Sequence, residues 1–220
     1  LMSILDLDYS HGIKEQLNQT ASIKSLGKFQ GLPFQFSNGH EHAYNMITNI
    51  LDSTDSPIAI VRVDTHSDCQ NKLEDKVDKT NYMSQIVFDK KFSKKISRVI
   101  KLWNSPTTGS HSYTFGDVSF NTLGAFNLPE INEPAILDID LDGCEIGLSN
   151  EFNTGRPGGH LYRRVYHTQE NITTHPVGLV RILKDRVKNP LTIGLALERG
   201  FRNRAYWYRI ERDFLLELEK

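Results

Sequence analysis

Two nearly continuous apolar runs constrain the fold of this chain most. Pro57–Asp64 and Leu191–Glu198 consist largely of Ile, Val, Leu and Ala, without the strict polar alternation of a strand that has one solvated face. Such runs are typical of strands buried on both faces, as in parallel sheets that helices cover on each side. Ile4–Tyr9 and Pro134–Asp142 also predict strands.

Segments with helical periodicity lie between these runs. We expect helices over about Glu41–Leu51, Ser84–Trp103 and Thr173–Val187, the last opened by Thr-Thr-His-Pro, a cap followed by a first-turn proline. A final helix over Arg204–Leu218 would pack one apolar face on the core. The alternation predicts an α/β sandwich with a mostly parallel sheet, in which ligands bind beyond the carboxyl ends of the strands.

Length and charge exclude several classes of protein. The 220 residues contain no linker-like or repetitive segment, so we expect a single domain over residues 1–220. Lys and Arg number 26 against 27 Asp and Glu. The net charge of -1 therefore provides no excess of positive charge with which to bind nucleic acid or an anionic membrane. No apolar run approaches the roughly 20 residues that span a bilayer, and the first residues do not resemble a signal peptide, so we expect a cytoplasmic protein.

Acidic groups and an imidazole gather at the ends of two predicted strands. One strand ends in Asp-x-His-x-Asp and another in Asp-x-Asp-x-Asp, and a period of two places each set on one face. So many carboxylates in one crevice are costly without a counter-cation, and a pair of divalent metal ions would neutralise them. Oxygen ligands with imidazole favour Mn, Mg or Fe over a thiolate-rich zinc site. The residues are Asp64, His66, Asp68, Asp138, Asp140 and Asp142.

Other potential ligands lie near these motifs. His40 and His42 stand at the start of the helix predicted before the Asp64 strand, and the residues alone do not decide which of them reaches the crevice. Cys69 and Cys144 follow the acidic motifs; a zinc thiolate site is the alternative, and we favour free thiols.

These motifs, with Thr154–Arg163 (Thr-Gly-Arg-Pro-Gly-Gly-His-Leu-Tyr-Arg) and the strand-end glutamate of Leu-Ala-Leu-Glu198, resemble the arginase and agmatinase (ureohydrolase) superfamily. The resemblance extends over about residues 38–200. It implies an arginase-like three-layer α/β/α sandwich and two Mn²⁺ ions, in preference to Fe²⁺, Co²⁺ or Zn²⁺. Asp64 and Asp140 would bridge the two ions.

By the same resemblance, the remaining ligands divide between the two sites: His40 and Asp68 would complete one, His66 and Asp142 the other. Two such ions lower the pKa of a shared water, so that hydroxide is available at neutral pH to attack a guanidinium carbon. Glu198 would accept the planar N–H groups of the substrate.

Two departures from the family pattern concern the substrate and the proton path. Met83 stands where arginases have a proton-shuttling histidine, so His160 or a water would take that role. Between Cys69 and Thr80 the Ser/Thr-rich loop that holds free arginine is replaced by charged residues. We therefore expect poor binding of a free amino acid.

The order of the motifs is similar to that of peptide arginases, which convert arginine residues of ribosomally made precursor peptides to ornithine and release urea. The expected partner is such an arginine-containing peptide. The alternatives are a hydrolase of a small guanidino compound or amide, and a metal-dependent binding module without activity. The sequence does not determine the oligomeric state. Expected substrate contacts come from Glu198, Asn81, Gly158 and Gly159.

Overall fold

The computed structural model describes residues 25–29, 32–37, 39–64, 68–69, 77, 81–103, 110–140, 176–196, 213–218 and 220. Several predicted features lie outside these residues, among them the strand Ile4–Tyr9 and the glycine-rich segment Thr154–Arg163. The same holds for His66, Asp142, Gly158, Gly159, His160 and Glu198.

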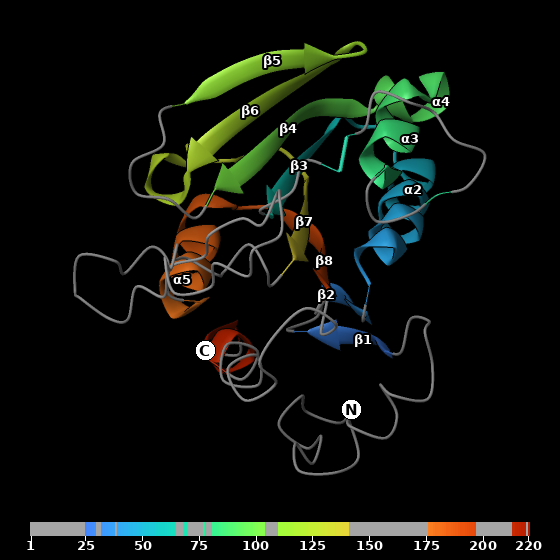
Figure 1. Cartoon of the computed structure of the whole chain (residues 1–220). Coiled ribbons are helices and arrows are strands. Elements are labelled where there is room, and N and C mark those ends of the chain that lie inside the picture. The colour runs from blue at the N-terminus through green and yellow to red at the C-terminus, as the bar shows by residue number, and fades with distance from the viewer. Residues whose placement is uncertain are drawn as a thin grey trace, which may run out of the picture.

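One mixed sheet of eight strands forms the centre of the described fold (Figure 1). Its spatial order is β1-β2-β8-β7-β3-β4-β6-β5. The inner neighbours from β2 to β6 pair in parallel, whereas β1 pairs antiparallel with β2 at one edge and β5 with β6 at the other. The strands are β1 (Ser25–Phe29), β2 (Leu32–Ser37), β3 (Ile58–Val63), β4 (Ile96–Trp103), β5 (His111–Phe115), β6 (Val118–Gly124), β7 (Ala135–Asp140) and β8 (Pro190–Ala196).

The predicted apolar strands lie in the middle of this sheet. β3 and β7 are buried at every residue, and β8 is buried over its last five, as expected for strands covered on both faces. These three predictions are confirmed within the described residues.

The helix predicted over Ser84–Trp103 is wrong over its second half. Helix α3 (Tyr82–Phe88) and the short α4 (Lys90–Ser93) are followed by strand β4, which pairs with β3 and β6. The spacing of Ile96, Val99 and Ile100 fits a helical period, but β-branched residues also suit a buried strand. Parallel pairing with β3 on one side and β6 on the other makes this segment a strand rather than a helix.

Helices cover both faces of the sheet (Figure 1). The 3-10 helix η2 (His40–His42), helix α2 (Ala43–Ser53), α3 and α4 lie on one face, where Met46, Ile47 and Ile86 pack against Ile60 and Ile136. Helix α5 (Pro176–Arg186) and the helical residues 213–218 lie on the other, with Leu179, Phe214 and Leu218 in a second core. A short 3-10 helix, η3 (Ala125–Asn127), follows β6.

The result is a three-layer α/β/α sandwich with a mostly parallel sheet, as predicted. The described part of helix α5 starts at Pro176, the proline predicted for its first turn, and the predicted cap at Thr173 and Thr174 lies outside the described residues. Among the residues that the structure describes, no helix is both long enough and apolar enough to cross a membrane.

Candidate metal centre

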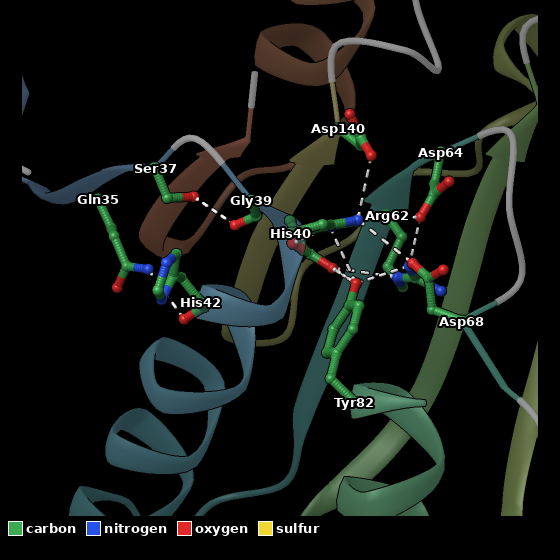
Figure 2. A network of polar contacts seen from close by, with 11 residues as sticks. Gln35, Ser37, Gly39, His40, His42, Arg62, Asp64, Asp68, Tyr82 and Asp140 are labelled. Atoms are coloured by element: carbon green, nitrogen blue, oxygen red, sulfur yellow. Dashed lines mark hydrogen bonds and ion pairs between the residues drawn. The ribbon is translucent and has the colours of Figure 1, made fainter. Parts of the chain in front are cut away.

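His40 opens η2 beside the carboxyl ends of β3 and β7 and is 2% exposed. Its Nδ1 atom lies 3.3 Å from Asp64 Oδ2, 3.2 Å from Asp68 Oδ2 and 3.3 Å from Asp140 Oδ2. Figure 2 shows the imidazole between these carboxylates, which approach it from separate segments of the chain. One ring nitrogen therefore faces three buried acidic groups.

The other ring nitrogen is held by a different pair of residues. His40 Nε2 lies 2.9 Å from Asp138 Oδ1 and 2.9 Å from the Tyr82 hydroxyl, which donates to Asp138 Oδ2 at 2.6 Å. A histidine that binds a metal through one nitrogen is commonly fixed by a carboxylate on the other. Asp138 and Tyr82 thus set the orientation in which Nδ1 faces the three acidic groups.

The donor set fits a divalent metal ion. The ligand atoms of His40, Asp64 and Asp140 all lie within 4.8 Å of one another, and all three side chains are buried. Two carboxylates and one imidazole form an oxygen-rich ligand set. Mn²⁺ and Fe²⁺ prefer such a set to one made of thiolates. The identity and number of the ions remain predictions.

The ionisation of the cluster also indicates a need for a cation. Burial raises the pKa of Asp64 well above its ordinary value, despite the nearby charge of Arg62. For His40 burial acts in the opposite direction, but Tyr82 and Asp138 outweigh it and raise the pKa well above its ordinary value. Asp64 and His40 therefore tend to retain their protons, which a bound divalent ion would displace. For Asp68 and Asp138 burial acts to raise the pKa, but contacts with His40 and Arg62 outweigh it and lower the pKa.

Arg62 is a buried participant that the sequence analysis missed. Its side chain is 1% exposed, and its Nη2 donates to Asp64 Oδ2 at 2.5 Å, Asp68 Oδ2 at 2.6 Å and the Tyr82 hydroxyl at 2.6 Å. Its Nε donates to Asp138 Oδ2 at 3.1 Å. The sequence signal that could have identified Arg62 is a charged residue within an otherwise apolar strand. If such a strand is covered on both faces, the guanidinium is buried and requires hydrogen-bond partners.

Arg62 belongs to a polar row that crosses the sheet. In register, Arg62 pairs with Asp138 of β7 and with Lys101 of β4, which pairs in turn with Thr122 of β6. Residues at the same register on neighbouring strands point to the same face. Two buried cations, Arg62 and Lys101, therefore lie next to each other on the face that α2 and α3 cover.

Asp68 reaches the centre by a different route from the one predicted. Strand β3 ends at Val63, and Asp68 has a φ of 47°, in the left-handed region that non-glycine residues seldom adopt. The extended conformation assumed by the period-two argument is therefore not present at Asp68 itself. Its carboxylate nevertheless lies 3.2 Å from His40 Nδ1.

The structure also separates the two candidate histidines. His42 is only partly buried, with Nε2 3.9 Å from Glu41 Oε1, and its backbone carbonyl accepts from Gln35 Nε2 at 2.9 Å. Figure 2 shows its ring on the side of η2 away from Asp64 and Asp140. His40, not His42, lies among the carboxylates.

The structure also describes three other residues that the sequence analysis singled out. Asn81 is fully buried before α3, where its carbonyl accepts from the Gln85 amide at 3.0 Å, and its expected substrate contact stays a prediction. Met83 is fully buried in the core beneath α3. Burial raises the pKa of Cys69 to about 11, so its thiol stays protonated at neutral pH.

Solved structures that share this fold include an agmatinase and a formimidoylglutamase. A hypothetical agmatinase from Burkholderia thailandensis aligns with a TM-score of 0.52 and 14% identity, over 84% of this chain and 57% of that one. Formimidoylglutamase from Bacillus subtilis aligns with a TM-score of 0.52 and 14% identity, over 86% of this chain and 60% of its own. The chain thus spans less than two thirds of the length of either structure.

No protein-family model matches the chain, and a search of curated proteins finds no match. At this level of identity the alignments establish the fold alone. The sandwich described above is the arginase-like α/β/α fold.

Proposed function

We propose that the chain is a metal-dependent hydrolase of the arginase and agmatinase superfamily that cleaves guanidinium groups. Arginine residues of a precursor peptide are the proposed substrates, converted to ornithine with release of urea. One observation carries the proposal: His40 Nδ1 faces the carboxylates of Asp64, Asp68 and Asp140 at the carboxyl ends of parallel strands. The fold shared with an agmatinase and a formimidoylglutamase supports it.

His40, Asp64 and Asp140 would hold the first metal ion, because their ligand atoms already lie together. Asp68, His66 and Asp142 are proposed to complete a centre for two Mn²⁺ ions. Ions bound there supply the Lewis acidity that makes water a competent nucleophile at neutral pH.

The protein's own groups prepare this centre. Asp138 and Tyr82 fix the His40 ring, and the burial of His40, Asp64 and Asp140 keeps bulk water from the carboxylates. Low polarity strengthens every charge interaction at the site, including the one with a cationic substrate. Glu198 is proposed to accept the planar guanidinium.

A peptide substrate is proposed because the chain lacks the polar loop with which arginases hold the α-groups of free arginine. In a peptide these groups are amides and need no such clamp. His160 or a water is proposed to transfer the proton, since Met83 is buried in the core and carries no titratable group.

Mass spectrometry tests the reaction directly. The Mn²⁺-loaded protein is incubated with arginine-containing peptides, free arginine and agmatine, and urea is assayed in parallel. The expected result is the arginine-to-ornithine mass loss on a peptide, with urea formed in equal amount and none with Asp140→Asn. Urea from agmatine alone would favour the small guanidino substrate, cleavage of an amide would favour the amide alternative, and tight metal binding without any turnover would favour the binding module.

A further inference from the structure

Arg62 contacts the same carboxylate oxygens that face His40. Asp64 Oδ2 accepts from Arg62 Nη2 at 2.5 Å and lies 3.3 Å from His40 Nδ1. Asp68 Oδ2 accepts from the same Nη2 at 2.6 Å and lies 3.2 Å from the same Nδ1. A metal ion bound between His40 and these carboxylates would share their oxygens with the guanidinium.

The guanidinium is also fixed in place. Its Nε donates to Asp138 Oδ2, its Nη2 donates to the Tyr82 hydroxyl, and the Tyr82 ring lies 5.1 Å from the guanidinium carbon. The side chain is 1% exposed. Arg62 therefore has no route into solvent, and its charge is permanent because arginine does not deprotonate in proteins.

Burial strengthens the interactions of the Arg62 charge with its neighbours. Four buried carboxylates, those of Asp64, Asp68, Asp138 and Asp140, converge here, and an unpaired buried carboxylate is strongly destabilising. A fixed guanidinium relieves this cost whether or not a metal is bound. The same positive charge repels a divalent ion a few ångströms away, and screening inside the protein is weak.

We propose that Arg62 is the built-in counter-cation of this centre, a positioning residue that keeps the carboxylate cluster folded without metal and lowers its affinity for divalent ions. The inference rests on the metal centre of the proposed function. It predicts that loss of the charge tightens metal binding. If Arg62 instead served chiefly to aim Asp64 and Asp68 at the metal, its loss would weaken binding.

Isothermal titration with Mn²⁺, checked by the paramagnetic signal of free Mn²⁺, measures the affinity. Arg62→Met removes the charge at similar length, and Arg62→Lys retains it. We expect Arg62→Met to bind Mn²⁺ about tenfold or more tightly than the wild type. Its metal-free form should melt at a lower temperature, and saturating Mn²⁺ should restore most of that loss. Arg62→Lys retains the charge but not the planar fork of donors, and it should bind Mn²⁺ less tightly than Arg62→Met.

Arg98→Met is the matched control. Arg98 lies on the neighbouring strand β4 and pairs with Glu133 at 2.7 Å on a partly exposed surface, so its loss should leave Mn²⁺ affinity unchanged. Arg62→Gln, which keeps a donor without the charge, is expected to behave as Arg62→Met and replaces it if that variant does not fold. Failure of both variants to fold in saturating Mn²⁺ overturns the proposal, because the ion should replace the missing charge.

The outcomes separate this inference from the proposed function. Weaker or equal Mn²⁺ binding by Arg62→Met, alongside a wild type that binds metal and releases urea, overturns the counter-cation alone. Tighter binding by the variant, with no urea from any protein, supports the counter-cation and removes the hydrolase. Absence of Mn²⁺ binding in every protein overturns both.

Discussion

Asp138 Oδ1 lies 2.9 Å from His40 Nε2, on the side of the imidazole opposite the nitrogen that faces Asp64, Asp68 and Asp140. The Tyr82 hydroxyl donates to the other oxygen of the same carboxylate. Asp138 therefore acts on the centre through His40, although the sequence placed it in one group with the metal-binding candidates Asp140 and Asp142.

Asp138→Asn should weaken Mn²⁺ binding by about 10- to 100-fold, as is usual when the carboxylate that orients a ligating histidine is lost. The amide keeps the shape of the side chain but removes the charge that faces the His40 ring. Titration calorimetry measures the change, and Glu133→Gln, a carboxylate paired with Arg98 away from the site, is the control. Unchanged affinity in Asp138→Asn would show that the ring is fixed by other contacts.

Chelation should abolish the proposed activity reversibly and lower the melting temperature of the protein. Free Mn²⁺ at about 100 times its Kd stabilises the folded state by about 2.7 kcal/mol. Mn²⁺ should restore more activity than Zn²⁺, because oxygen ligands dominate the centre. Scanning calorimetry and urea assays after EDTA treatment and metal return measure both effects. Restoration by Zn²⁺ alone would place Cys69 or Cys144 among the ligands.

Asp140→Ala should abolish both Mn²⁺ binding and activity. The residue ends β7 with its carboxylate 3.3 Å from His40 Nδ1, within the group of closely spaced ligand atoms. Metal content after dialysis, determined by elemental analysis, gives the result independently of turnover. Asp185→Ala is the matched control, because it also removes a carboxylate but from the exposed surface of α5, and its metal content should equal that of the wild type. Wild-type metal content in Asp140→Ala would contradict the proposed centre.

Glu198→Gln should retain the fold and the metal content yet lose orders of magnitude in urea release. Removing the charge while keeping the shape would eliminate the proposed charge-assisted bidentate contact to the planar cation, which is expected to be strongest in the transition state. Steady-state kinetics on an arginine peptide, with metal analysis of the same sample, separate the two effects. Normal processing of the peptide by this variant would exclude Glu198 as the guanidinium partner.

Cys69 should resist alkylation in the native protein at pH 8. Its pKa of about 11 is raised chiefly by burial above that of an exposed thiol, so little thiolate is present. The raised value also means that the buried thiol contributes stability at neutral pH and loses it as pH rises toward 11. Iodoacetamide labelling with peptide mapping should give a rate at least about tenfold below that of the urea-denatured chain. Equal rates would show that the thiol is exposed.

The sequence predicted the sheet best where burial is most complete. The runs that became β3, β7 and β8 are apolar because both of their faces are covered, and that requirement is visible residue by residue. β4 was mistaken for a helix because Ile96, Val99 and Ile100 fit two periods at once. The choice between them depends on pairing with β3 and β6, strands that are distant in the sequence.

The sequence alone predicted acidic groups at two strand ends and a pair of candidate histidines before them, because these motifs are local patterns of residue type and spacing. Tertiary structure decided which group takes which place. It brought His40 rather than His42 to the carboxylates, placed the Asp68 carboxylate 3.2 Å from His40 Nδ1, and set Arg62 between Asp64, Asp68 and Asp138. The contacts that Asp138 makes with Arg62 and with His40 join residues far apart in the chain. The pairing of β3 with β7 places Arg62 beside Asp138, and no local sequence pattern encodes that pairing.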